Sequence, residues 1–126
     1  MTTHKPDIKS EILRILDEKK MIDIEELDTS SLNSRMSDYL IIASGTSSVH
    51  MQSVADFLYR FLKSEMRLKA HIEGTARNGW ILLAVKGIEV HFFKPELREY
   101  YDIKSILTNG SHPSTLEEFY EINCKF

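Results

Sequence analysis

Two uninterrupted apolar runs constrain the fold of this chain more than any other feature. They are residues 39–43 (YLIIA) and residues 80–85 (WILLAV). A continuous apolar run of this length is typical of a strand that is covered on both faces. The second run turns back at Lys86 and Gly87 into residues 88–93, which predicts a hairpin. The sequence therefore predicts a sheet with a buried centre.

Amphipathic helices are predicted before and after the first apolar run. Apolar residues recur at helical spacing over residues 8–16, where Pro6 is expected to open the helix, and again over residues 51–62. Weaker patterns predict strands at residues 22–27 and 70–73, a turn at Asn78 and Gly79, and short helices at residues 95–101 and after Ser114.

Together these elements indicate one α/β domain with a mixed β-sheet flanked by helices. The chain has 126 residues, of which 42% are hydrophobic, and this suits a single domain with its own core. We assign residues 1–107 to this domain. Residues 108–126 are expected to form a linker and a short C-terminal helix of unknown role.

Charge and cysteine content exclude several classes of protein. The formal net charge is −3, which argues against a protein that holds nucleic acid mainly by neutralising phosphates. The only cysteine, Cys124, leaves no disulfide framework and no thiolate metal cluster. No apolar run is long enough to cross a membrane, and residues 1–7 lack a signal-peptide pattern. We therefore expect a cytoplasmic protein without a membrane partner.

One segment is basic although the whole chain is acidic. Residues 60–86 carry six basic and two acidic side chains, a net charge of +4. A solvated helix face explains such a pattern, and so does a contact surface. The sequence leaves both interpretations open.

The residues after the first apolar run are all small: Ser44, Gly45, Thr46, Ser47 and Ser48. A strand followed by such a loop and a helix can form an anion site, because N–H groups at a helix start point outward and small side chains let a phosphate approach. However, the loop has no lysine and neither of the glycine patterns typical of nucleotide-binding loops. In the alternative interpretation, Ser47 or Ser48 caps the helix.

The sequence contains no catalytic constellation and no metal site, and we expect no cofactor. The histidines lack the spacing of metal ligands. Two-metal chemistry needs paired carboxylates, to which Asp23 and Glu25 come nearest. His91 and Glu89 are expected on one strand face, as a general-base pair in a cleft, a surface pair or a satisfied core histidine. The residues themselves therefore predict a protein that is not an enzyme.

Trp80, the only tryptophan, heads the second apolar run. Its indole either packs in the core or anchors a protein interface, where tryptophan is enriched and supplies a large contact area. The sequence is compatible with both roles.

Two blocks of the sequence resemble the signatures of a known family. The first is residues 38–48 (DYLIIASGTSS) followed by residues 54–56 (VAD). The second consists of residues 73–74 (EG), 80–83 (WILL), 90–93 (VHFF) and 96–102 (ELREYYD). On these motifs, which span roughly residues 7–107, the chain resembles the ribosomal silencing factors, also called Iojap-like proteins.

The resemblance implies a nucleotidyltransferase-like fold that lacks the catalytic carboxylates of that superfamily. It also implies that the protein binds the large ribosomal subunit through its fourteenth protein, at the face against which the small subunit docks. Bound there, it would obstruct subunit joining and lower translation when nutrients are scarce. No direct sequence-specific contact with nucleic acid is implied, and a homodimer is compatible with the resemblance.

The same resemblance places the ribosomal contact on the strand that begins at Trp80. We predict a partner-binding surface formed by Trp80, Leu83, Ala84, Val85 and Lys86.

This chain differs from the family at that strand. The family usually has an acidic residue in place of Ala84, and Gly-Asp in place of Lys86 and Gly87. It also has Leu-Trp in place of Ile106 and Leu107. These differences indicate either a co-varied partner or a weaker interaction. The alternative function is a nucleotide-binding or nucleotidyl-transferring enzyme that uses the loop of residues 44–48.

Overall fold

The computed structural model describes residues 7–28 and 38–100, with side chains up to residue 97. Helices and strands follow one another in the order α1 (Ile8–Glu18), β1 (Ile22–Asp28), β2 (Tyr39–Ser44), α2 (Ser48–Ser64), β3 (His71–Thr75), the 3₁₀ turn η1 (Ala76–Asn78), β4 (Trp80–Val85), β5 (Ile88–Phe93) and α3 (Pro95–Tyr100).

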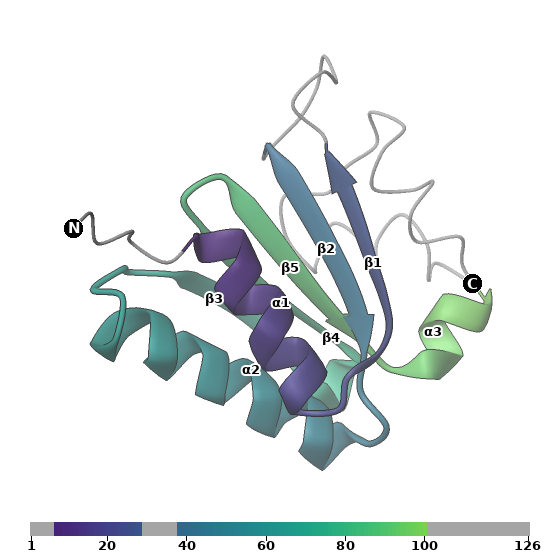
Figure 1. Ribbon diagram of the computed structural model, residues 1–126. Helices are drawn as coiled ribbons and strands as arrows, with labels where there is room; N and C mark the ends of the chain where they lie inside the picture. Colours follow the sequence, from purple (N-terminus) through teal and green to yellow (C-terminus); the bar gives the residue numbers. More distant parts are fainter. Residues whose placement is uncertain (1–6, 29–37, 101–126) are drawn as a thin grey trace.

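The five strands form one mixed sheet in the order β1-β2-β5-β4-β3 (Figure 1). Strands β2 and β5 are parallel, and the other neighbouring pairs are antiparallel. The two apolar runs of the sequence become β2 and β4, and β5 lies between them. Most residues of these three strands are buried, as the continuous apolar runs predict.

Helices α1 and α2 both lie on one face of the sheet, which we call the helix face (Figure 1). Helix α1 begins at Ile8 because the Asp7 carboxylate accepts a hydrogen bond from the Ser10 N–H at 3.2 Å. Both helices turn an apolar stripe toward the sheet and bury it there. The strand residues that complete this core are Ile41, Ala43, Ile81, Leu83, Val85, Ile88, Val90 and Phe92.

The opposite face, which we call the second face, carries a smaller apolar cluster. Alternate residues along a strand point to opposite faces, so the second face receives the residues that the helix face does not. Its buried members are Leu40, Ile42, Trp80 and Phe93. Leu27 of β1 and Leu97 of α3 pack against this cluster.

The predicted α/β domain with a mixed sheet and helices is confirmed, but several element bounds differ. The third strand is His71–Thr75 instead of residues 70–73, because the chain continues through Gly74, at a φ of 87°, before it turns. The predicted turn at Asn78 and Gly79 is the end of η1, where Gly79 has a φ of 85°. Strand β1 exists but is irregular, with a bulge between Ile22 and Glu25.

Some predictions fall outside the described residues. These are the opening of the first helix at Pro6, the linker and helix of residues 108–126, and the domain boundary at residue 107. Among the described residues, no helix combines the length and the apolar character that a membrane crossing requires.

Candidate functional site

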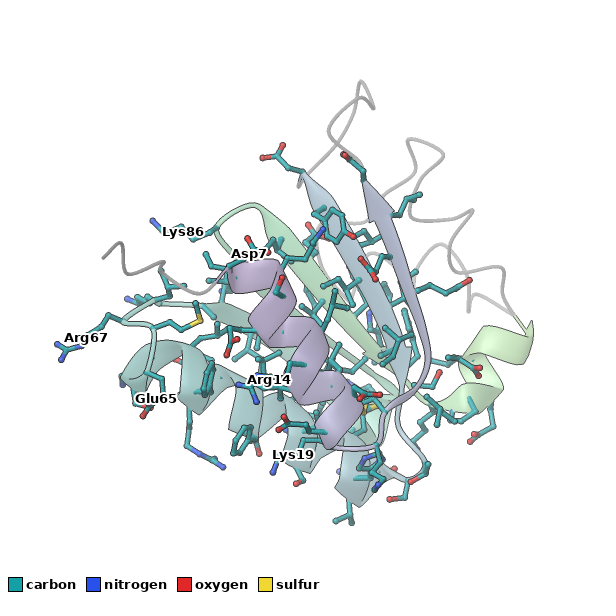
Figure 2. The ribbon with its side chains drawn as sticks, viewed as in Figure 1. Asp7, Arg14, Lys19, Glu65, Arg67 and Lys86 are labelled. Atoms are coloured by element: carbon teal, nitrogen blue, oxygen red, sulfur yellow. The ribbon has the colours of Figure 1, made fainter. Side chains whose placement is uncertain are left out.

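The predicted site residues lie at two opposite ends of the sheet. The loop of residues 44–48 lies at the end where Ser44 and Trp80 both pair with Phe93, and we call this the loop end. The β4–β5 turn at Lys86 and the start of β3 lie at the other end. We call it the basic end, defined by Lys63, Arg67, Lys69 and Lys86. Figure 2 shows Arg67 and Lys86 at this end, and Lys19 away from it.

The loop end is closed by hydrogen bonds within the chain. Ser47 caps α2, since its hydroxyl accepts from the His50 N–H at 3.0 Å. The Thr46 N–H donates to His50 Nδ1 at 2.9 Å, and the Gly45 N–H donates to the Phe93 carbonyl at 3.1 Å. The N–H groups of Gly45, Thr46 and His50 are therefore occupied, and the helix-cap interpretation of Ser47 is confirmed.

His50 also ties this loop to the rest of the fold. Its Nε2 lies 2.6 Å from the Lys19 carbonyl oxygen, an acceptor, so Nε2 carries the proton that is donated. Its Nδ1 is then the acceptor that Thr46 requires. The imidazole thus joins the start of α2 to the α1–β1 connection.

Gly45 is required by helix packing. A Cβ built on Gly45 would lie 2.8 Å from the Cβ of Met51, a distance that real Cβ atoms do not tolerate. The absence of a side chain thus lets α2 start close against the end of β2. Capping thus accounts for Ser47, and close packing accounts for Gly45.

Trp80 lies at the loop end and is buried. Its side chain is 1% exposed, and its Nε1–H donates to His91 Nδ1 at 2.9 Å. His91 Nε2 in turn lies 3.0 Å from a Glu89 carboxylate oxygen, and both residues are buried. The core role of Trp80 is the one that its burial supports, and His91 is a satisfied core histidine.

The five residues of the predicted contact surface are divided between the two faces of β4. Leu83 and Val85 belong to the core of the helix face, whereas Trp80 and Ala84 point to the second face. Trp80 and Lys86 are also six residues apart, about 20 Å along an extended strand. Only Ala84, partly, and Lys86, fully, are exposed. The five side chains therefore do not lie together on one exposed surface of the described structure.

Ala84 and Lys86 lie beside a shallow pocket at the basic end. Its volume is about 200 Å³, and residues of the β4–β5 hairpin line it together with Lys69 and His71. His71 is the cross-strand neighbour of Ala84, and its Nε2 lies 3.0 Å from a Glu73 carboxylate oxygen. The Lys86 and Gly87 turn is tight, with φ angles of 48° and 80°.

Tyr39 is a further residue of this end, since its N–H donates to the Gly87 carbonyl at 3.1 Å. Its hydroxyl donates to the Glu26 carboxylate of the neighbouring strand. Burial, and next the bond to Glu26, raise the pKa of Tyr39 to about 12. The hydroxyl therefore stays protonated and donates.

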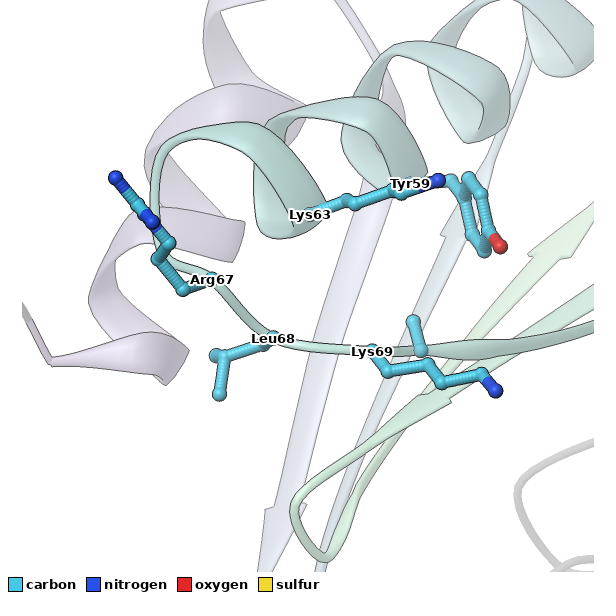
Figure 3. A pocket seen from close by; sticks show the side chains of 6 residues that line it. Tyr59, Lys63, Arg67, Leu68 and Lys69 are labelled. Atoms are coloured by element: carbon cyan, nitrogen blue, oxygen red, sulfur yellow. The ribbon is translucent and has the colours of Figure 1, made fainter.

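A larger pocket lies at the basic end between the last turns of α2 and the segment that leads into β3 (Figure 3). Its volume is about 470 Å³, and it is lined by Tyr59, Lys63, Arg67, Leu68, Lys69 and Ala70. The sequence predicted none of these residues as a site. The signal that pointed to them was the +4 charge of residues 60–86.

In the described part of the chain, no group of three or more histidine, cysteine, aspartate or glutamate side chains is placed to hold a metal ion. The nearest approach in sequence, Asp23 and Glu25, lies on the irregular edge strand β1.

The model of one protein family matches nearly the whole chain. It is described as "Ribosomal silencing factor during starvation", and it matches residues 2–122. The chain is 32% identical over 89 residues to the ribosomal silencing factor RsfS of Zymomonas mobilis, an overlap that covers 71% of this chain and 66% of that protein. It is 30% identical over 87 residues to the mouse protein named mitochondrial assembly of ribosomal large subunit protein 1, covering 67% of this chain.

The fold is also similar to a solved structure. A crystal structure of a protein from Chromobacterium violaceum superposes with a TM-score of 0.71 at 33% identity, covering 86% of this chain and 88% of that one. The matched region thus covers 66% of the length of the Z. mobilis relative and 38% of the length of the mouse relative. It covers 88% of the C. violaceum structure.

Proposed function

Because the chain belongs to the ribosomal silencing factor family, we propose that it binds the large ribosomal subunit through that subunit's fourteenth protein. Bound at the face where the small subunit docks, it obstructs subunit joining and represses translation when nutrients are scarce. The observation that carries this proposal is the family match over residues 2–122. Relatives named as a silencing factor and as a large-subunit assembly protein support the ribosome as the partner.

We place the ribosomal contact at the basic end, around Ala84 and Lys86. These two are the exposed members of the predicted contact set, and they border the shallow pocket that His71 and Lys69 also line. Trp80, by contrast, is buried and does not contact the partner in this proposal. It stabilises the apolar cluster on the second face of the sheet, the face to which Ala84 points. Since Lys86 replaces a family glycine here, the partner surface must accommodate a cation at this position.

The proposed action is binding without catalysis. The enzyme alternative depended on the loop of residues 44–48, and the N–H groups of Gly45, Thr46 and His50 are already bonded there. No observation favours that alternative.

The proposed site of action is the cytoplasm. The edge strand β3 is the element through which we propose that a second copy pairs in a homodimer.

Co-sedimentation with isolated large subunits tests this proposal, followed by an assay of their joining to small subunits. The parent protein should sediment with large subunits and reduce joining. Lys86→Glu should weaken the binding about tenfold, equivalent to about 1.4 kcal/mol, because it reverses a charge at the contact.

Lys20→Glu is the matched control. Lys20 is likewise an exposed lysine with a positive φ, 67° against 48° for Lys86, but it lies near the loop end. Its replacement should leave binding within twofold. A parent protein that fails to sediment with large subunits, or equal losses for the two variants, would contradict the proposal.

A further inference from the structure

The larger pocket at the basic end combines a concave shape with positive charge. Tyr59 and Lys63 lie one turn apart on the same side of α2, and the segment from Arg67 to Ala70 forms the opposite wall (Figure 3). Arg67 has a φ of 58°, which turns the chain sharply after the helix. Leu68, half-buried, and Ala70, buried, add an apolar part to the lining.

The cations of this pocket are uncommitted within the described residues. Lys63, Arg67 and Lys69 are all exposed, and none of them forms an ion pair or lies over an aromatic ring there. Among the other cations of the fold, Lys20 and Arg77 are likewise exposed and without an ion pair in the described residues, but some are engaged. Arg14 bridges Glu11 and Glu18, for example, and Lys19 lies over the ring of Phe57.

Helix stabilisation explains only part of this pattern. A cation in the last turn of a helix interacts favourably with the helix dipole, and Lys63 satisfies that condition. Arg67 and Lys69 lie beyond the helix end, where the dipole effect has fallen off. Lys63 and Lys69 both line the pocket, whereas the guanidinium of Arg67 points away from it (Figure 3).

We infer that this pocket binds the phosphate backbone of RNA without reading its sequence. A volume of about 470 Å³ lies within the usual range of ligand sites and suits a nucleotide unit. Cations that follow a groove neutralise phosphates, and an aromatic side chain such as Tyr59 offers a surface for a base or a ribose. The exposed lysine side chains fix no donor and acceptor pattern of the kind that base recognition needs.

This inference rests on the proposed function, because the large subunit presents RNA beside its proteins. Lys69 lines both pockets of the basic end, so the inferred RNA contact adjoins the proposed protein contact around Ala84 and Lys86. The net charge of −3 agrees with a contact that supplements a protein interface and does not replace it.

The direct test measures binding of a labelled oligouridine of about ten nucleotides by fluorescence anisotropy at several salt concentrations. The pocket variant is Lys63→Gln with Lys69→Gln. The control is Lys20→Gln with Arg77→Gln, which removes the same charge near the loop end. The pocket variant should bind about tenfold more weakly, and its salt slope should be smaller by about 1.4, since each single-strand phosphate contact contributes about 0.7.

The control should stay within twofold of the parent. Absence of RNA binding by the parent would overturn the inference, as would equal losses in the two double variants. A polyglutamate peptide of the same length serves as the competitor. If it bound more tightly than the RNA and depended on Lys63 and Lys69, the pocket would be a site for acidic protein instead.

A second arm uses isolated large subunits and separates the two proposals. If the parent sediments with large subunits while the pocket variant retains the full affinity and salt slope, the RNA contact is wrong and the proposed function stands. If the parent does not sediment with large subunits, the proposed function is wrong. In that case the oligouridine measurement still tests whether the pocket binds RNA.

Discussion

The two ends of the sheet differ in how their polar groups are used. At the loop end, the N–H groups of Gly45, Thr46 and His50 all have acceptors within the chain. At the basic end, Lys63, Lys69 and Lys86 form no ion pair among the described residues. Groups that are satisfied inside a fold have little to offer a ligand, whereas exposed unpaired charges do. This difference supports our proposal that the loop end is structural and that binding takes place at the basic end.

The comparison also shows that a loop of small residues after a buried strand can serve helix packing instead of ligand binding. Serine and glycine after a buried strand suggest a phosphate site, but here they allow α2 to start close to β2. The same residue types serve either purpose, and what decides is the presence of an internal acceptor such as His50 Nδ1.

The largest effect is expected for Trp80→Ala at the loop end. The indole is 1% exposed and bonded to His91, so its removal should cost about 3–5 kcal/mol of unfolding free energy. Lys86→Ala at the basic end should change stability by less than about 0.5 kcal/mol. Urea unfolding of both variants measures this, and a Trp80→Ala protein as stable as the parent would break the comparison.

A smaller loss is expected for Gly45→Ala. The added Cβ would approach the Cβ of Met51 to 2.8 Å, so α2 must shift, at a cost of about 1–3 kcal/mol. Val49→Ala is the control, because Val49 is 80% exposed and should change stability by no more than about 0.5 kcal/mol. A Gly45→Ala variant with an unchanged melting temperature would contradict the close approach of α2 to the end of β2.

The smallest effect is expected at Tyr39 of the basic end. Its pKa is raised from 10.0 to about 12 in the folded state. The unfolded chain therefore loses this proton first, and the contribution of Tyr39 to stability is complete below pH 10 and declines between pH 10 and about 12. Most of this effect is screened by solvent.

Tyrosinate absorbance of the parent, minus that of Tyr39→Phe, isolates the titration of this group. The difference should rise with a midpoint well above pH 10. A midpoint at or below pH 10 would show that the hydroxyl is not held by Glu26.

Much of the fold could be predicted from the sequence, because local patterns decided it. The apolar runs fixed β2 and β4 as buried strands, and the helical spacing of residues 51–62 fixed α2. The bulge in β1 was not predictable, since a bulge depends on how the strand pairs with β2. The 3₁₀ turn before Gly79 was likewise predicted only as a simple turn.

The candidate site was predicted less well, for two physical reasons. Strand alternation alone places Trp80 and Leu83 on opposite faces of β4, so a contact set that contains both cannot form one surface. The pocket of Lys63 and Lys69 does not follow from any such alternation, because it depends on the sharp turn at Arg67, a non-glycine residue with a positive φ. Nothing in the residue types indicates that conformation.

Hydrogen exchange of the protein bound to large ribosomal subunits tests the central claim most directly, because it observes both ends of the sheet at once. Peptides that cover residues 84–89 and 63–70 should exchange more slowly in the complex. Peptides that cover residues 44–50 should exchange at the same rate as in the free protein. Protection confined to residues 44–50, with residues 63–70 and 84–89 unchanged, would contradict the assignment of binding to the basic end.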